Sequence, residues 1–514
     1  PNSRYLAFLD RYHLFVTRVS PSSSTIILDA SKPAFPTRRI SKIGAAYPTW
    51  SDDSSSISWS VGSQFKTVKM SDVFSVDGEI PNNVVDLSIE FPSERPSSKL
   101  ALIDAMIVTM NENRNVIENG TVLIEENRII TVGNKETVIP TDFQKINLNG
   151  KTLLPGFVDA HAHGPYGRDE IIPNANWSLL AHLALGVTTI HDPSSRARSV
   201  FATAEYARVG KILAPRIFST GEIIYGAKSP YWAQVDELED ALAHVRRLKA
   251  QGAMSIKNYN QPRREQRQQV NEAARLENML SVAEGGSLYH MDMSLIIDGS
   301  GGIEHNIPTL RIYDDVVQLW SQTDVGYTPT LVVTYGGLTA EDYYYQKSDI
   351  WKHRVLSKFV PPSVLQPRSI RRTMAPESDY RDDDAASAAK KLSDAGVTVN
   401  TGAHGQREGL GTHWEMWSFA RGGFSPMEAI ATATINYASY LGMENELGSI
   451  EEGKLADILI LSRNPLSNIQ NTDSVEYVIL NGRMYEAETL AEQVSGDRSA
   501  PQLHWRDKSE NHIH

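Results

Sequence analysis

The segment Leu154-Pro155-Gly156-Phe157-Val158-Asp159-Ala160-His161-Ala162-His163-Gly164 places two histidines directly after a short apolar strand. Residues i and i+2 of an extended strand point to the same side, so the imidazoles of His161 and His163 can reach one cation. Neutral imidazole nitrogens bind zinc-type cations at about 2.0–2.1 Å. A lone His-x-His pair is a weak signal, but its position at a strand end predicts a metal centre.

The region around this segment, residues 155–440, alternates short apolar strands with helical stretches. Predicted strands cover 157–160, 187–190, 254–257, 279–282 and 397–400, and predicted helices cover 235–251 and 382–395. This length of strand and helix alternation predicts an α/β fold, a (β/α)8 TIM barrel. In such barrels the active site lies at the carboxyl ends of the strands, which is where His161 and His163 fall.

Two groups of strands flank the barrel region and predict one small β-sandwich domain built from residues 99–154 and 441–490. On one flank, strands over 121–125 and 128–132 are joined by Glu126-Asn127; on the other, strands over 475–480 and 483–485 are joined by Asn481-Gly482. Asn-Gly between strands strongly favours a tight hairpin. Residues 491–514 are polar and are expected to form a frayed tail.

Residues 1–92 predict short β-strands, over 5–9, 13–19 and 25–28 among others. The turn Pro48-Thr49-Trp50-Ser51-Asp52, followed by Ile57-Ser58-Trp59, resembles one blade of a TolB-type β-propeller. One or two blades cannot close a ring, so we expect this fragment to contact missing blades or the next domain. An unrelated β-rich extension is the alternative. Since the chain opens at Pro1 within a predicted strand, we expect it to be part of a longer protein.

The composition is that of an ordinary globular protein of 514 residues, which predicts two or three domains. The net charge of −12 argues against nucleic acid or an anionic membrane surface as a partner. The absence of cysteine excludes disulfides, thiolate metal sites and a cysteine nucleophile. No apolar run reaches the ~20 residues that span a bilayer. A cytoplasmic, periplasmic or secreted location stays open.

Five segments together resemble the amidohydrolase superfamily, in its imidazolonepropionase-like and prolidase-like branch: 127–133, 154–163, 186–190, 303–305 and 447–458. The resemblance covers residues 100–490. More narrowly, the chain resembles a subgroup in which a TolB-like propeller precedes the hydrolase. The resemblance implies a hydrolase that cleaves a C–N bond with one or two divalent cations, for which we expect zinc.

In such proteins a carboxylated lysine follows strand 4, histidines follow strands 5 and 6, and an aspartate follows strand 8. The resemblance therefore implies that Lys257 is a metal ligand, as a carbamate that bridges two cations, and that His305 is a ligand and a catalytic residue. Burial that disfavours the ammonium form helps a carbamate to form. An ordinary surface lysine is the alternative for Lys257. Glu304 is then expected to support the site rather than to bind metal.

Two positions depart from the family pattern. Where the family has a histidine after strand 5, the spacing to His305 places Glu284, and a carboxylate is a competent ligand. His290 competes for that position or contacts substrate instead. Where the family has Gly-Thr-Asp after strand 8, this chain has Gly402-Ala403-His404. His404 is either a replacement ligand and base, or a sign of a reduced metal count. His413, which follows it, is either a site residue or a packing residue.

Substrate contacts are expected from Tyr231, Tyr259 and Arg407, in or near loops at the mouth of the barrel, with loop packing as the alternative. The first expected substrate is a small molecule, a dipeptide or N-acyl amino acid. A lactam or other nitrogen heterocycle, hydrolysed or deaminated, is the second. A non-catalytic binding protein with a degenerate site is the rival from another class. We also expect either a homo-oligomer or association with the propeller segment before Pro1.

Overall fold

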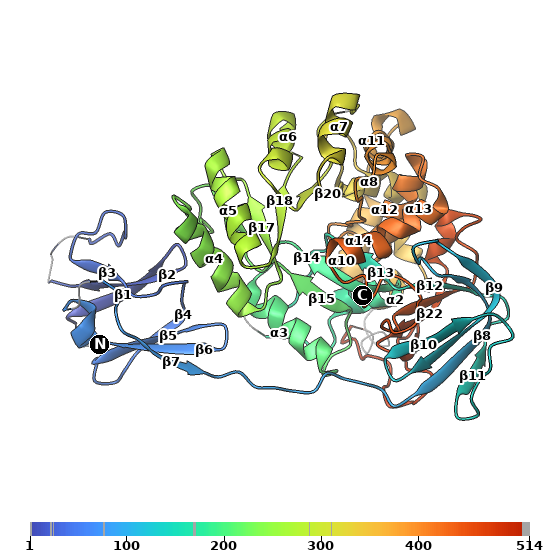
Figure 1. Cartoon of the computed structure of the whole chain (residues 1–514), viewed down its shortest axis with the longest axis horizontal. Helices are drawn as coiled ribbons and strands as arrows, with labels where there is room; N and C mark the ends of the chain where they lie inside the picture. The colour runs from blue at the N-terminus through green and yellow to red at the C-terminus, as the bar shows by residue number, and fades with distance from the viewer. Residues whose placement is uncertain are drawn as a thin grey trace, which may run out of the picture. The chain divides into compact units, whose positions relative to one another are not determined.

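The computed structural model describes residues 3–20, 23, 25–75, 78–167, 171–286, 288–309 and 311–505. The protein is a mixed α/β molecule (Figure 1). Its backbone contacts divide it into two compact units. The first unit comprises Pro1–Pro92, Ser194–Phe201 and Ser219–Ser281, and the second comprises Ser93–Pro193, Ala202–Phe218 and Val282–His514. Among the described residues, no helix combines the length and the apolar character that a membrane span requires.

The N-terminal part of the first unit contains two antiparallel sheets. One holds β1 (Tyr5–Asp10), β2 (His13–Arg18) and β3 (Thr37–Arg39); the other holds β4 (Ala46–Trp50), β5 (Ser56–Val61), β6 (Gln64–Lys69) and β7 (Asn83–Asp86), with the short helix α1 (Met70–Val73). Alternate residues of β5, including Ile57 and Trp59, are buried in one core with Leu14 of β2. The strand predicted over 25–28 is wrong: these residues join no sheet, and Ile27 is 78% exposed.

The remainder of the first unit is built from strands and helices. The strand β16 (Ile224–Tyr225) pairs in parallel with β17 (Ser255–Tyr259), and the helices are α4 (Leu238–Gln251) and α5 (Arg264–Leu276). Asp240 accepts from the backbone of Glu237 in a reciprocal cap at the start of α4, and Gly252, at φ +116°, ends the helix. The helix predicted over 235–251 is therefore confirmed, with its start three residues later than expected.

An eight-stranded sheet in the second unit combines strands from both flanks of the chain. Its order is β10-β9-β8-β12-β21-β22-β23, and β11 pairs with β8. Figure 1 shows the blue and teal strands of the N-terminal flank beside the red strands of the C-terminal flank. The strands are β8 (Lys99–Val108), β9 (Val116–Glu125), β10 (Arg128–Gly133), β11 (Gln144–Asn147), β12 (Thr152–Pro155), β21 (Ile458–Leu461), β22 (Val475–Leu480) and β23 (Arg483–Glu486).

Both predicted hairpins of this sheet are confirmed. Glu126 and Asn127 connect β9 to β10, where Arg128 pairs with Glu125. Asn481 and Gly482 connect β22 to β23 and adopt φ values of +51° and +78°. Two consecutive positive φ angles are what a tight two-residue hairpin turn requires.

The second unit also contains parallel strands followed by helices, and the elements over 197–208, 216–219 and 280–284 include residues of both units. β13 (Phe157–Asp159) pairs in parallel with β14 (Val187–Asp192), which neighbours β15 (Arg216–Ser219); β18 (Leu280–Glu284), β19 (Gly302–Glu304) and β20 (Gly326–Thr328) also pair in parallel. The strand predicted over 397–400 is reduced to a single bridge between Val399 and Tyr327. The helices of these segments are α2 (Trp177–Ala184), α3 (Ala197–Arg208), α6 (Tyr289–Ile297), α7 (Asp314–Ser321), α8 (Ala340–Lys347), α9 (Leu356–Phe359), α10 (Pro362–Ile370), α11 (Asp382–Asp394), α12 (Leu410–Arg421), α13 (Pro426–Thr432) and α14 (Ile435–Tyr440), with 3-10 turns η1 (Leu331–Val333), η2 (Ile350–Lys352), η3 (Glu377–Asp379) and η4 (Ile469–Asp473).

Candidate metal centre

Three histidines of the second unit converge beyond the ends of parallel strands. His161 follows β13, His305 follows β19, and His404 follows the segment that bridges to β20. One ligand atom from each of the three lies within 4.8 Å of the others. The ring centroid of His161 lies 4.9 Å from that of His305 and 5.0 Å from that of His404. His161 and His305 are buried, and His404 is half-buried.

His161 is held by two carboxylates. Its Nδ1 contacts Oε2 of Glu304, the last residue of β19, and its backbone N–H donates to Oδ1 of Asp159 over 3.1 Å. The same Asp159 oxygen accepts from the N–H of Ala403 over 2.9 Å, which ties β13 to the segment that carries His404. Burial raises the pKa of Asp159, and these backbone donors oppose the shift.

His305 lies between a hydroxyl and a carboxylate. Its Nδ1 is 2.8 Å from Oγ1 of Thr330, and its Nε2 is 3.3 Å from Oε1 of Glu284. Glu284 ends β18 and is the parallel neighbour of Glu304, so the pairing of β18 with β19 brings both carboxylates to this edge. The backbone of His305 has φ +71°, a left-handed conformation that is rare for a non-glycine residue and that clusters at functional sites.

His404 shares the left-handed conformation, at φ +56°, and its Nδ1 is 3.3 Å from Oε1 of Gln406. The ring of His163 lies 4.7 Å from that of His404 and 5.0 Å from that of His161. Nδ1 of His163 is 3.1 Å from Oδ1 of Asp192, a buried residue at the end of β14. Asp192 was missed in the sequence, although its place at the end of a buried strand, directly after His191, is a signal that could have identified it.

The donor set fits a divalent cation. In His161, His305 and His404 the Nδ1 atom contacts an oxygen of a neighbouring side chain. Metal-bound histidines almost always use their second ring nitrogen in this way, because the contact fixes the tautomer and orients the ring. Three convergent imidazoles are also the donor type that zinc prefers.

The remaining candidates of the second unit differ in their surroundings. His290 is exposed on α6, whereas Glu284 lies beside His305. Arg407 is 12% exposed and forms a 3.3 Å ion pair with Glu408. His413 is fully buried: its Nε2 is 2.8 Å from the carbonyl oxygen of Leu185, and burial lowers its pKa. The packing alternative for His413 is therefore confirmed.

Three candidates belong to the first unit. Lys257 is buried in β17. Tyr259, at the end of the same strand, packs its ring 5.2 Å from that of Tyr225, and Tyr231 is 60% exposed. Carbamate formation on Lys257 and substrate contacts from the two tyrosines stay predictions.

The sequence is similar to proteins of known family. The model of the amidohydrolase family matches residues 152–485, more than half of the sequence. The chain belongs to the amidohydrolase family. An imidazolonepropionase of Symbiobacterium thermophilum is 25% identical over 389 residues, which are 68% of this chain and 84% of that protein. A 5-methylthioadenosine/S-adenosylhomocysteine deaminase of Bacillus thuringiensis is 43% identical over 68 residues, 13% of this chain and 15% of the relative.

Solved structures share the fold of this amidohydrolase. A Xaa-Pro dipeptidase with bound methionine has a TM-score of 0.59 at 23% identity, covering 76% of this chain and 100% of that one. Ochratoxinase of A. niger has a TM-score of 0.57 at 20% identity, covering 76% and 96% of the two chains. With the family established, the protein is a metal-dependent hydrolase that acts on C–N bonds.

Proposed function

We propose that this amidohydrolase cleaves the amide bond of a dipeptide or an N-acyl amino acid at a zinc centre held by His161, His305 and His404. The observation that carries the proposal is the convergence of three imidazole ligand atoms within 4.8 Å. His163, Glu284 and a carboxylated Lys257 complete the proposed ligand set, and a second cation would use them. The likeness in fold to a Xaa-Pro dipeptidase supports the substrate class.

The proposed architecture places this centre in a closed (β/α)8 barrel over residues 155–440. Two sets of parallel strands, β13–β15 and β18–β20, support the barrel. We assign the flanking strands over 99–154 and 441–490 to a β-sandwich domain, and the sheets within residues 1–92 to blades of a TolB-like propeller. Residues 491–514 are assigned to a polar tail, of which 506–514 lie outside the described residues. A homo-oligomer, or association with a preceding propeller segment, remains part of the proposal.

The residues of the site have distinct roles in this proposal. A divalent cation bound here supplies Lewis acidity and lowers the pKa of water toward neutrality. Where the cation leaves one ring nitrogen of His404 free, this imidazole accepts the proton of the attacking water and delivers it to the leaving nitrogen, as a positioned imidazole base can do. His305 would act through the cation that it helps to hold, whose charge would stabilise the negative charge that develops on the substrate oxygen. Glu304 positions His161, and Arg407 is the proposed contact for a substrate carboxylate.

A cyclic amide or an amino-substituted heterocycle is the second candidate substrate. The observation that favours it is the likeness to an imidazolonepropionase over 68% of the chain, together with the short segment shared with a deaminase. The same donor set can serve both candidates, because attack of water on an amide carbon and on an amidine carbon require the same Lewis acid and base.

The test measures the metal content of the protein and its turnover of candidate substrates on the same preparation. Protein purified without chelator is analysed by inductively coupled plasma spectrometry and then assayed on dipeptides, N-acyl amino acids, lactams and amino-heterocycles, with products identified by mass spectrometry. Two equivalents of zinc and dipeptide cleavage support the proposal in full. One equivalent removes the bridging roles of Lys257 and Glu284. Turnover of heterocycles alone supports the second candidate, and no bound metal after metal-replete expression contradicts both.

A further inference from the structure

A cavity lies in the second unit, formed by residues that take no part in the metal centre. Its volume is about 250 Å³. The turn at Asn127, the turn at Asn481 and the segment 212–218 that leads into β15 form much of its lining. None of the histidines of the metal centre lines it. Since a water molecule occupies about 30 Å³ in the liquid, the cavity has room for a ligand of roughly eight to ten non-hydrogen atoms.

One part of the cavity wall is apolar. It is formed by side chains of α3, of the segment 212–218 that runs into β15, of the segment before β21 and of β22: Ala204, Ala207, Ile212, Phe218, Leu455 and Leu480. These apolar side chains can contact a hydrocarbon group, while the polar residues of the lining can fix the orientation of a ligand. The apolar wall favours a ligand with a hydrocarbon body over a free inorganic ion.

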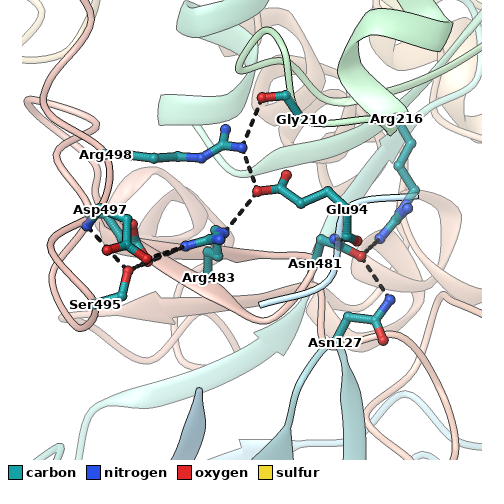
Figure 2. A network of polar contacts seen from close by, with 10 residues as sticks. Glu94, Asn127, Gly210, Arg216, Asn481, Arg483, Ser495, Asp497 and Arg498 are labelled. Atoms are coloured by element: carbon teal, nitrogen blue, oxygen red, sulfur yellow. Dashed lines mark hydrogen bonds and ion pairs between the residues drawn. The ribbon is translucent and has the colours of Figure 1, made fainter. Parts of the chain in front are cut away.

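The polar part of the wall includes Arg498, which pairs with Glu94 of the lining; Glu94 also pairs with Arg483, which is not a lining residue. Figure 2 shows Glu94 between Arg483 and Arg498: its Oε1 accepts from Nε of Arg483 over 3.0 Å and contacts Arg498. Arg498 also donates to the carbonyl oxygen of Gly210 over 2.9 Å. The side chain of Asn481 donates to the backbone oxygen of Glu94 over 2.8 Å, which fixes the position of this segment.

Two further guanidinium groups of the lining are also paired. Arg216 donates to the two oxygens of Asp457 over 2.9 and 3.3 Å. Arg128 donates to Glu446 over 2.7 Å. Three of the five arginines that line the cavity, Arg128, Arg216 and Arg498, therefore have a carboxylate partner.

The other two arginines of the lining, Arg95 and Arg208, are exposed. Within the part of the chain that the structure describes, neither guanidinium has an ion pair or a side-chain hydrogen bond. The cavity lining thus carries an excess of positive charge at groups that remain accessible to a ligand. Guanidinium groups match carboxylates in geometry and bind them through paired N–H donors.

We propose that this cavity binds a small organic carboxylate, with its hydrocarbon body against the apolar wall and its anionic group at Arg95 and Arg208. The paired arginines serve a different purpose, because they connect residues 94, 210, 457 and 498 into a rigid frame around the cavity. This site is independent of the reaction at the metal centre.

The test uses the full, metal-loaded chain and isothermal titration calorimetry. The probes are benzoate, the uncharged benzyl alcohol and inorganic phosphate. We expect benzoate to bind at least about tenfold more tightly than either of the other probes, because only it offers both the charge and the hydrocarbon body. Equal binding of the acid and the alcohol would overturn the claim that the site recognises an anionic group. Equal binding of the acid and phosphate would overturn the claim that it recognises a hydrocarbon body.

Variants locate the binding. The double variant Arg95→Gln, Arg208→Gln is expected to bind benzoate at least about tenfold more weakly, whereas Arg371→Gln, which replaces an exposed arginine outside the lining, should bind it unchanged. Ala207→Phe is expected to abolish binding by filling the cavity. Urea denaturation verifies that each variant is folded. Binding that survives both the arginine and the alanine changes but disappears in His305→Ala would belong to the metal centre and would refute the proposal.

Discussion

The family resemblance led us to expect an aspartate at the position of His404, and the proposed function gives its imidazole the role of ligand or base. We predict that His404→Ala lowers kcat/KM for the amide substrate by about 10²–10⁴-fold, the contribution of a positioned acid–base group, and reduces the metal content. His504→Ala replaces an exposed histidine and should change neither quantity. Steady-state kinetics and metal analysis measure both effects. Unchanged turnover in His404→Ala would remove this residue from the mechanism.

A substitution of Glu304 tests whether the orientation of the ligand His161 matters, without removing the ligand itself. Its carboxylate contacts Nδ1 of His161, and loss of such a partner costs about 10–100-fold in metal affinity. We predict a loss of this size in Glu304→Gln, measured by competition with a chromophoric chelator, with activity restored at high metal concentration. Glu118→Gln, at an exposed position of β9, is the control. If the two variants hold metal equally, the contact with His161 has no positioning role.

The sequence indicates the histidines of the centre but only part of their surroundings. His161 follows an apolar run that forms β13, whereas His305 and His404 were indicated by the resemblance to the amidohydrolase family. Thr330 and Asp192 lie far from the histidines that they contact, and those contacts depend on strand pairing and loop paths that no local pattern encodes. Local periodicity identifies a strand end, whereas the neighbours at that end are set by the tertiary fold.

At the level of elements, close packing of the segment before His404 against β13 leaves no room for a side chain at Gly402. A Cβ atom there would lie 2.7 Å from Cβ of His161 and 2.5 Å from Cγ2 of Thr328. We predict that Gly402→Ala displaces His161 and lowers kcat/KM by about tenfold to a hundredfold. Gly164→Ala is the matched control, since its Cβ would meet only ordinary contacts at 3.5 Å and beyond. Equal activity of the two variants would contradict this steric account.

Strands with strong turn signals were predicted well, and strands that depend on a partner were not. The Asn481-Gly482 hairpin forms as expected because its dihedral requirement is local. The run over 25–28 has β-branched residues but no sheet edge to join, and the run over 397–400 keeps one bridge. Strand propensity depends on packing against neighbours, so an isolated apolar run predicts a strand less reliably than a hairpin turn does.

At the scale of the whole molecule, two buried histidines of the first unit predict sensitivity to acid. The rings of His13 in β2 and His244 in α4 lie 5.9 Å apart. Burial, aided by neighbouring arginines, lowers the pKa of His13 to about 4 and that of His244 to about 3. In the unfolded chain both titrate near 6.5, so the unfolded state binds more protons as the pH falls below 6.5.

Stability is therefore complete above pH 6.5 and decreases as the pH falls toward 4. At pH 5 we expect a loss of about 2 kcal/mol in the free energy of unfolding for each histidine. Urea denaturation of wild type, His13→Gln and His244→Gln at pH 7 and pH 5 measures it: each variant should reduce the difference between the two pH values. His504→Gln should leave that difference unchanged. A wild-type protein equally stable at both pH values would contradict the assignment.

The composite sheet has a consequence for synthesis on the ribosome. β12 pairs with β21, and about 300 residues separate the two strands in the chain. At translation rates of about 5–20 residues per second, the nascent polypeptide carries β12 for roughly 15–60 s before its partner has been made. During that interval the apolar run Thr152–Pro155 presents an unpaired edge, which is the surface that chaperones shield. The synthesis of β21 thus determines when the exposed edge of β12 is covered and can no longer promote aggregation.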